Sequence, residues 1–184
     1  IIMGILNITE YSFYDGGKYL QPKKIISQVE KMLDEGASII DIGAQSTKPN
    51  AISKGPHEEC KILLPAIKLL RKKFKNIFLS TDTYWSLVAE QSIKLGANMV
   101  NDVSAGNIDP NMFKTISKLK VPYILMHMQG RPENMQNNPN YKDVVNEVYS
   151  FFEKKIKELE NLGFNEIIID PGLGFGKNLK HNYT

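Results

Sequence analysis

The chain has 184 residues, of which 42% are hydrophobic and 23% are charged, so its composition is that of a globular domain and not of a disordered or fibrous protein. Its formal net charge is only +3, with neither the dense basic patch of a nucleic-acid-binding protein nor the run of about 20 apolar residues that spans a membrane. The single cysteine, Cys60, cannot form an internal disulfide, which is typical of a reducing compartment. We therefore expect a cytoplasmic protein that binds neither nucleic acid nor a membrane.

Short apolar runs alternate along the chain with longer segments of helical periodicity. Ile, Val, Phe and Tyr dominate most of the runs, which are too short for helices and are therefore predicted to be buried strands. The predicted strands are Ile1–Leu6, Ser38–Ile42, Ile77–Thr81, Asn98–Val100, Val121–Met126 and Glu166–Ile169. The predicted helices are Pro22–Glu35, His57–Lys75, Tyr84–Leu95, Pro110–Leu119 and Tyr141–Leu162.

Successive β/α units predict a parallel sheet, either closed into a (β/α)₈ barrel or open and doubly wound. Polar residues favour the barrel, because one stands at or near the end of every predicted strand, and in a barrel these positions meet at one rim, where the active site lies. They are Asn7, Asp41, Asp82, Asn101, His127 and Asp170. We therefore predict an α/β fold, a (β/α)₈ TIM barrel of which this chain holds the first six β/α units.

Several familiar catalytic motifs are absent from the sequence. The glycine-rich segment Pro171–Lys177 has proline where a Walker A loop requires its first glycine. The three histidines are scattered, which excludes zinc-ligand spacing, and no G-x-S-x-G elbow is present for a serine nucleophile. Covalent catalysis and a tight zinc site are therefore not expected.

The rim is instead rich in carboxylate and amide groups. Asp82 and Asp170 are predicted to accept hydrogen bonds from a flat, guanidine-like heterocycle, because a carboxylate offers two acceptors in one plane. Asn101 would contact a neighbouring edge of the ring, while Met126 and Phe175 either cover its faces or simply pack in the core.

Two segments that follow strands are long for connections between a strand and a helix, and long connections often form binding loops. They are residues 7–17 and 43–50. In the second, Lys48 next to Thr47 would suit an anionic group, although a solvated lysine in a surface turn explains the pattern equally well.

Six tracts of the sequence resemble, in order and at matching spacing, those of the dihydropteroate synthase family of the folate pathway. The tracts are residues 3–17, 41–49, 80–83, 101–104, 125–130 and 170–177. This resemblance implies a (β/α)₈ barrel that joins 6-hydroxymethyl-7,8-dihydropterin diphosphate to p-aminobenzoate, with Mg²⁺ as cofactor and a homodimer as the full-length assembly. Its products would be 7,8-dihydropteroate and diphosphate.

The resemblance also assigns roles to individual residues. Asn7 would bind the Mg²⁺ and the diphosphate, Thr47 would hold substrate, and Asp82 and Lys48 would act in catalysis. The residues that would bind the pterin or lie beside it are Asp82, Asn101, Met126, Asp170 and Phe175. Lys48 stands where the family usually has arginine, so it keeps the charge but loses the bidentate geometry of a guanidinium.

Residues 1–184 are expected to form one partial pterin-binding domain whose last two β/α units, with further substrate-binding residues, would lie beyond Thr184. On that reading we expect the 184-residue piece to be inactive alone. Two other functions stay open: a pterin-binding methyltransferase domain of the folate–corrinoid type, and a non-catalytic pterin-binding module.

Overall fold

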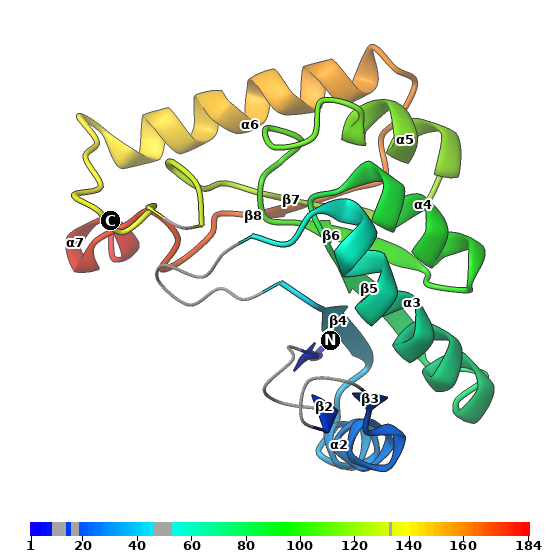
Figure 1. Cartoon of the computed structure of the whole chain (residues 1–184). Coiled ribbons are helices and arrows are strands. Elements are labelled where there is room, and N and C mark those ends of the chain that lie inside the picture. The colour runs from blue at the N-terminus through cyan, green and yellow to red at the C-terminus, as the bar shows by residue number, and fades with distance from the viewer. Residues whose placement is uncertain (9–13, 16–18, 46–52, 133) are drawn as a thin grey trace.

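The structure, a computed structural model, describes residues 1–8, 14–15, 19–45, 53–132 and 134–184. A parallel sheet forms its centre, with its six strands in the order β1-β4-β5-β6-β7-β8 (Figure 1). These strands are β1 (Met3–Asn7), β4 (Ile39–Gly43), β5 (Phe78–Asp82), β6 (Met99–Asp102), β7 (Tyr123–Met126) and β8 (Ile167–Asp170). Within this sheet, each strand pairs with the sheet's next strand along the chain, as in a barrel and unlike a doubly wound sheet, whose order reverses.

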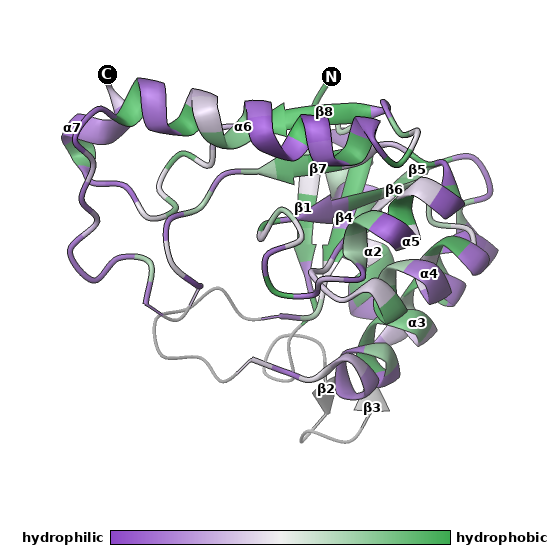
Figure 2. Ribbon diagram, turned by 90° about the horizontal axis from the view of Figure 1, so that it is seen from above, coloured by the Kyte–Doolittle hydropathy of each residue, from purple (hydrophilic) through white to green (hydrophobic). Residues whose placement is uncertain are grey.

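Helices separate the strands along the chain. They are α2 (Pro22–Asp34), α3 (Pro56–Lys73), α4 (Ser86–Lys94), α5 (Met112–Leu119), α6 (Val144–Glu160) and the short α7 (Leu179–Asn182). Figure 2 shows strands that are mostly green and helices that alternate between green and purple, the pattern of amphipathic helices laid against an apolar sheet. Within the described ranges, none of the helices combines the length and the apolarity needed to cross a membrane.

The core lies between the helices and the outer face of the sheet. Leu6, Ile40 and Leu79 pack in one cluster with residues of α2 and α3, and Val100 and Leu125 pack in a second cluster with residues of α5 and α6. Burial of these apolar side chains is the main force that holds each β/α unit together. The strands consequently have fixed positions, and so do the residues at their carboxyl ends.

The inner face of the sheet is more open. Ile5, Phe78 and Ile168 are 53%, 38% and 47% exposed, and β1 and β8 form the two edges of the sheet in the described part of the chain. The predicted fold is confirmed: the chain holds the first six β/α units of a TIM barrel, with a parallel sheet and alternating helices.

The predicted end of β7 at Met126 is confirmed, whereas the other predicted strand ends fell one or two residues short. Asn7, Asp82 and Asp170 are the last residues of their strands, and Asn101 is the last but one, whereas Asp41 lies two residues before the end of β4. The apolar pattern reports which side chains are buried, but the ladder depends on backbone groups, which polar residues also provide. The backbone of these rim residues is therefore held by the sheet itself.

The helix limits differ for local reasons, and two small elements were missed. The last predicted helix begins at Val144 and not at Tyr141, because Asp143 caps it by accepting a hydrogen bond from the Asn146 N–H at 3.1 Å. The missed elements are α7 and a two-stranded antiparallel pair, β2 (Tyr14–Asp15) with β3 (Tyr19–Leu20).

Candidate functional site

One register row brings together three of the predicted site residues. Asn7 pairs with Gly43, Gly43 with Asp82, and Asp82 with Asn101, across β1, β4, β5 and β6. Partners in a parallel ladder point to the same face, so the side chains of this row lie side by side on the inner face at the carboxyl ends of the strands.

The Gly43 position makes room for Asp82. A Cβ atom built on Gly43 would lie 2.8 Å from Asp82 Oδ2 and 3.1 Å from Asp82 Cβ, so no other residue fits there without moving the aspartate. Asp82 is half-buried, and its pKa is raised well above the ordinary value, first by burial and then by the negative charges of Asp41, Glu59 and Asp102. A ligand that donates several hydrogen bonds would relieve this carboxyl group.

Asp41 lies one step deeper on the same face and was not among the predicted binding residues. It is 1% exposed, and Asn101 Nδ2 donates a hydrogen bond to its Oδ2 at 2.8 Å. Burial raises the pKa of Asp41, and the neighbouring Ser80 hydroxyl and Asn101 amide offset part of that rise. The signal in the sequence was its place inside an apolar strand, where an aspartate is rare without a role.

Asp41 and Asn101 each have one buried side-chain oxygen that accepts no hydrogen bond from the described residues. These atoms are Asp41 Oδ1 and Asn101 Oδ1. Such atoms are costly unless a donor satisfies them. The neighbouring Ser80 hydroxyl, whose Oγ also has no partner among the described residues, can donate to Asp41, and a ligand N–H group would satisfy the acceptor that remains.

Glu59, in the first turn of α3, is a second residue that the sequence did not single out. Its side chain is completely buried and accepts a hydrogen bond from Gln45 Nε2. The Gln45 amide also bonds to both backbone groups of Lys54, at 2.9 Å and 3.0 Å. Burial raises the pKa of Glu59 to about 7, although hydrogen bonds from the Thr83 and Gln45 side chains act to lower it. The pair therefore ties the end of β4 to the start of α3.

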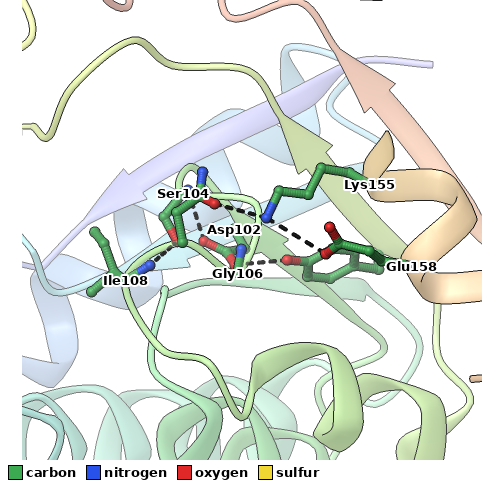
Figure 3. A network of polar contacts seen from close by, with 8 residues as sticks. Asp102, Ser104, Gly106, Ile108, Lys155 and Glu158 are labelled. Carbon is green, nitrogen blue, oxygen red and sulfur yellow. Dashed lines mark hydrogen bonds and ion pairs between the residues drawn. The ribbon is translucent and has the colours of Figure 1, made fainter. Parts of the chain in front are cut away.

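Asn101 is also supported from behind by a polar network around Asp102 (Figure 3). The buried Asp102 carboxylate accepts hydrogen bonds from the Tyr123 hydroxyl at 2.6 Å, the Ser104 N–H at 2.7 Å and the Gly106 N–H at 2.8 Å. Burial raises the pKa of Asp102, and the hydrogen bonds from these donors offset part of that rise. The network fixes the turn after β6 and, with it, the neighbouring Asn101.

Met126 and Asp170 form the next row, on β7 and β8, where they are register partners. Met126 is buried, and the Asp170 Oδ1 accepts a hydrogen bond from the Gly172 N–H at 2.8 Å. Phe175, half-buried, lies in the glycine-rich loop, residues 171–176, that follows β8. That loop packs against the exit of β7, because a Cβ on Gly172 would come within 2.1 Å of the His127 carbonyl oxygen.

The structure thus brings Asn7, Asp82 and Asn101 together in one row, with Met126 and Asp170 in the next. Thr47 and Lys48 lie outside the described residues.

In the part of the chain that the structure describes, no group of three or more His, Cys, Asp or Glu residues is placed to hold a metal ion. Mg²⁺ nevertheless takes few protein ligands and keeps water and phosphate oxygens, so the exposed Asn7 amide oxygen at the rim fits its chemistry.

Comparisons with known proteins agree with this geometry. A family described as pterin binding enzyme matches residues 3–184. The chain is 46% identical over 184 residues to the folic acid synthesis protein of Pneumocystis carinii, covering 98% of this chain and 25% of that protein.

Solved structures of dihydropteroate synthases are similar over nearly the whole chain. The enzyme of Yersinia pestis, solved with a sulfonamide drug, is 38% identical with a TM-score of 0.89, covering 99% of this chain and 66% of that one. The enzyme of Xanthomonas albilineans, solved with 4-aminobenzoic acid, is 36% identical with a TM-score of 0.87, covering 99% and 64%. The chain therefore spans about two thirds of these enzymes and a quarter of the fungal protein.

Proposed function

Because the chain belongs to the family of pterin-binding enzymes, we propose that the protein carrying it is a dihydropteroate synthase. Its substrates are then 6-hydroxymethyl-7,8-dihydropterin diphosphate and p-aminobenzoate, and its products 7,8-dihydropteroate and diphosphate. The relatives named as this enzyme and the 4-aminobenzoic acid bound by one of them support this assignment.

The observation that carries the proposal is the pair of open buried oxygens on Asp41 and Asn101, beside the carboxyl group of Asp82. A pterin ring has a guanidine-like edge with several N–H donors in one plane, which is what closely placed carboxyl and amide oxygens accept. Binding such donors would lower the pKa of Asp82 and leave its carboxylate negatively charged next to the ring.

That negative charge suits the reaction. The bond between the pterin methylene carbon and the diphosphate oxygen breaks, the diphosphate leaves with the electron pair, and the amine nitrogen of p-aminobenzoate bonds to the same carbon and loses a proton. Positive charge develops on the pterin as the diphosphate departs, and the Asp82 carboxylate stabilises that charge electrostatically. No protein nucleophile is needed.

The negative charge of the leaving diphosphate must be neutralised by positive charge nearby. We assign Asn7, at the end of β1, as the protein group that would hold Mg²⁺, which neutralises charge on phosphate oxygens. Lys48 and Thr47 would hold the same anionic part of the substrate, an assignment that rests on the family resemblance alone.

The test is turnover by the protein that carries this sequence, measured as diphosphate released from the pterin substrate in the presence of p-aminobenzoate. We expect Asp82→Asn to lower kcat/KM by at least about a hundredfold, because it removes the charge that stabilises the transition state. Asp34→Asn, on the exposed side of α2, is the matched control and should retain activity. Full activity in Asp82→Asn, or diphosphate release with no p-aminobenzoate joined to the pterin, would contradict the proposal.

A further inference from the structure

The glycine-rich loop, residues 171–176, is followed by a buried lysine that the mechanism above does not use. Lys177 is 5% exposed. Its Nζ lies 2.9 Å from His127 Nδ1, 3.1 Å from the Gly172 carbonyl oxygen and 3.2 Å from the Phe175 carbonyl oxygen, and 3.4 Å from the His127 carbonyl oxygen. An ammonium group has three N–H donors, so Lys177 is fully used by the loop and by the residue that follows β7.

The protonation states in this cluster follow from the same contacts. Burial and the charge of Lys177 lower the pKa of His127 to about 4, so its imidazole is neutral at neutral pH. Because an ammonium only donates, His127 Nδ1 accepts, and the ring proton sits on Nε2. The His127 ring also packs edge-on against Phe151, with 4.9 Å between ring centroids, which fixes its orientation.

The loop held in this way contains one residue of the site, Phe175, and contacts a second, Asp170, at the end of β8. Gly172 donates to the Asp170 carboxylate, and the Phe175 N–H donates to the Gly172 carbonyl oxygen at 3.0 Å, the same oxygen that Lys177 binds. At the far end of the loop, the Tyr141 hydroxyl donates to the Gly176 carbonyl oxygen at 2.8 Å. The lysine thus lies where the carbonyl groups of the loop converge.

We propose that Lys177 is a positioning residue for the pterin site: its ammonium group gathers the Gly172 and Phe175 carbonyl oxygens against the His127 ring and so holds the loop in the shape that presents Asp170 and Phe175. This inference rests on the proposed function, since it concerns the same site. Lys177 touches none of the reacting atoms in this account and acts through the loop.

The charge of Lys177 gives the inference a pH signature. Burial lowers the pKa of Lys177 to about 8, and the Asp170 carboxylate opposes that shift. Above this pKa the amine keeps only two N–H donors, so one of its acceptors loses its bond. Two titratable groups that touch the cluster keep one charge state between pH 7 and 9, because the pKa of His127 is about 4 and burial and Glu147 raise the pKa of Tyr141 above its usual 10. The other charged or titratable groups that face the cluster are Asp170, Glu147 and His181, whose ring packs against Tyr141 with 4.8 Å between ring centroids.

The experiment measures the affinity of the protein for 6-hydroxymethyl-7,8-dihydropterin diphosphate by calorimetry, without p-aminobenzoate, between pH 7 and 9. The variants are Lys177→Met, which keeps the length without the charge, and Lys177→Arg, which keeps the charge at all these pH values. Lys180→Met, an exposed lysine three residues on, is the matched control. Amide hydrogen exchange at Gly172 and Phe175 in the ligand-free protein reports the loop without the pterin.

We expect Lys177→Met to weaken pterin binding at pH 7 by about tenfold or more and to speed exchange at both amides. Wild-type affinity should fall between pH 7 and 9, and that fall should be absent from both Lys177 variants. Unchanged affinity and exchange in Lys177→Met would overturn the inference.

If Lys177→Met does not fold, the wild-type pH profile and the Lys177→Arg variant decide, and a flat wild-type profile overturns the inference. A wild-type protein that shows protected loop amides but binds no pterin contradicts the proposed function instead.

Discussion

The rim of this sheet has two halves that differ in how well their polar groups are satisfied. The acidic half consists of Asp41, Asp82 and Asn101 on β4, β5 and β6. Its carboxyl pKa values are raised, and two of its buried oxygens have no hydrogen-bond partner among the described residues. In the glycine-rich half, β7, β8 and residues 171–176, carbonyl oxygens converge on Lys177. The difference indicates that hydrogen-bond donors of a ligand would satisfy the acidic half. In the glycine-rich half, the protein's own Lys177 already donates to the carbonyl oxygens of the loop.

The largest expected effect on stability is at Gly172, in the glycine-rich half. We expect Gly172→Ala to destabilise the protein by about 4 kcal/mol, because its Cβ would come within 2.1 Å of the His127 carbonyl oxygen at a φ of +65°. Gly174→Ala is the control, since its φ is +80° but nothing lies within 4 Å, and it should cost only about 1 kcal/mol of strain. Urea unfolding measures both, and equal losses would show that the close approach to His127 does not matter.

In the acidic half, by contrast, we expect that removing a buried charge stabilises the protein. Glu59, which lies beside this half, should give the clearest dependence of folding stability on pH. Its pKa is about 7 in the folded protein against an ordinary 4.5, so as pH rises from 4.5 to 7 the unfolded chain releases this proton before the folded one does. The contribution of Glu59 to folding stability therefore falls by about 2 to 3 kcal/mol across that window.

Glu59→Gln should remove that part of the pH dependence, because it has no proton to release, and should leave the variant more stable than the wild type at pH 7.5. Unfolding in urea at pH 4.5 and pH 7.5 provides the measurement. If the free energies of unfolding of the wild type and the variant differ by the same amount at both pH values, the cost of burial does not come from the charge of Glu59. Gln45 would keep its bonds to Lys54 in either protein, which separates the charge from the contact.

The two halves also differ in how far the sequence predicted them. The register row of Asn7, Asp82 and Asn101 could be predicted because apolar runs indicate the order of the strands and place their carboxyl ends to within two residues, and a barrel brings those ends together. Asp41 was placed at the rim but was given no binding role, because it lies inside a strand. Glu59 was missed because the periodicity of α3 does not reveal which of its charged residues faces inward.

The glycine-rich loop was recognised as a motif, but the role of its lysine was not. Lys177 contacts the residue after β7, 50 positions earlier in the chain, and no local pattern in the sequence reports such a contact. The same holds for Gly43, whose need for glycine comes from Asp82 on the neighbouring strand. What the sequence could not supply was contact between units, whereas the order and type of the units followed from local periodicity.

The smallest expected effect tests whether the acidic half trades stability for binding. Asp82→Asn should raise the free energy of unfolding at pH 7.5 by about 1 kcal/mol, because it removes a half-buried carboxyl group whose pKa is raised by burial and by Asp41. The gain is modest since neighbouring carboxyl groups readjust their protonation when one of them is lost. The gain should shrink as the pH falls, because protonation of the wild-type carboxyl group removes the charge whose burial is costly. A variant that loses stability at pH 7.5 would mean that Asp82 supports the fold, and the contrast between the two halves would then be wrong.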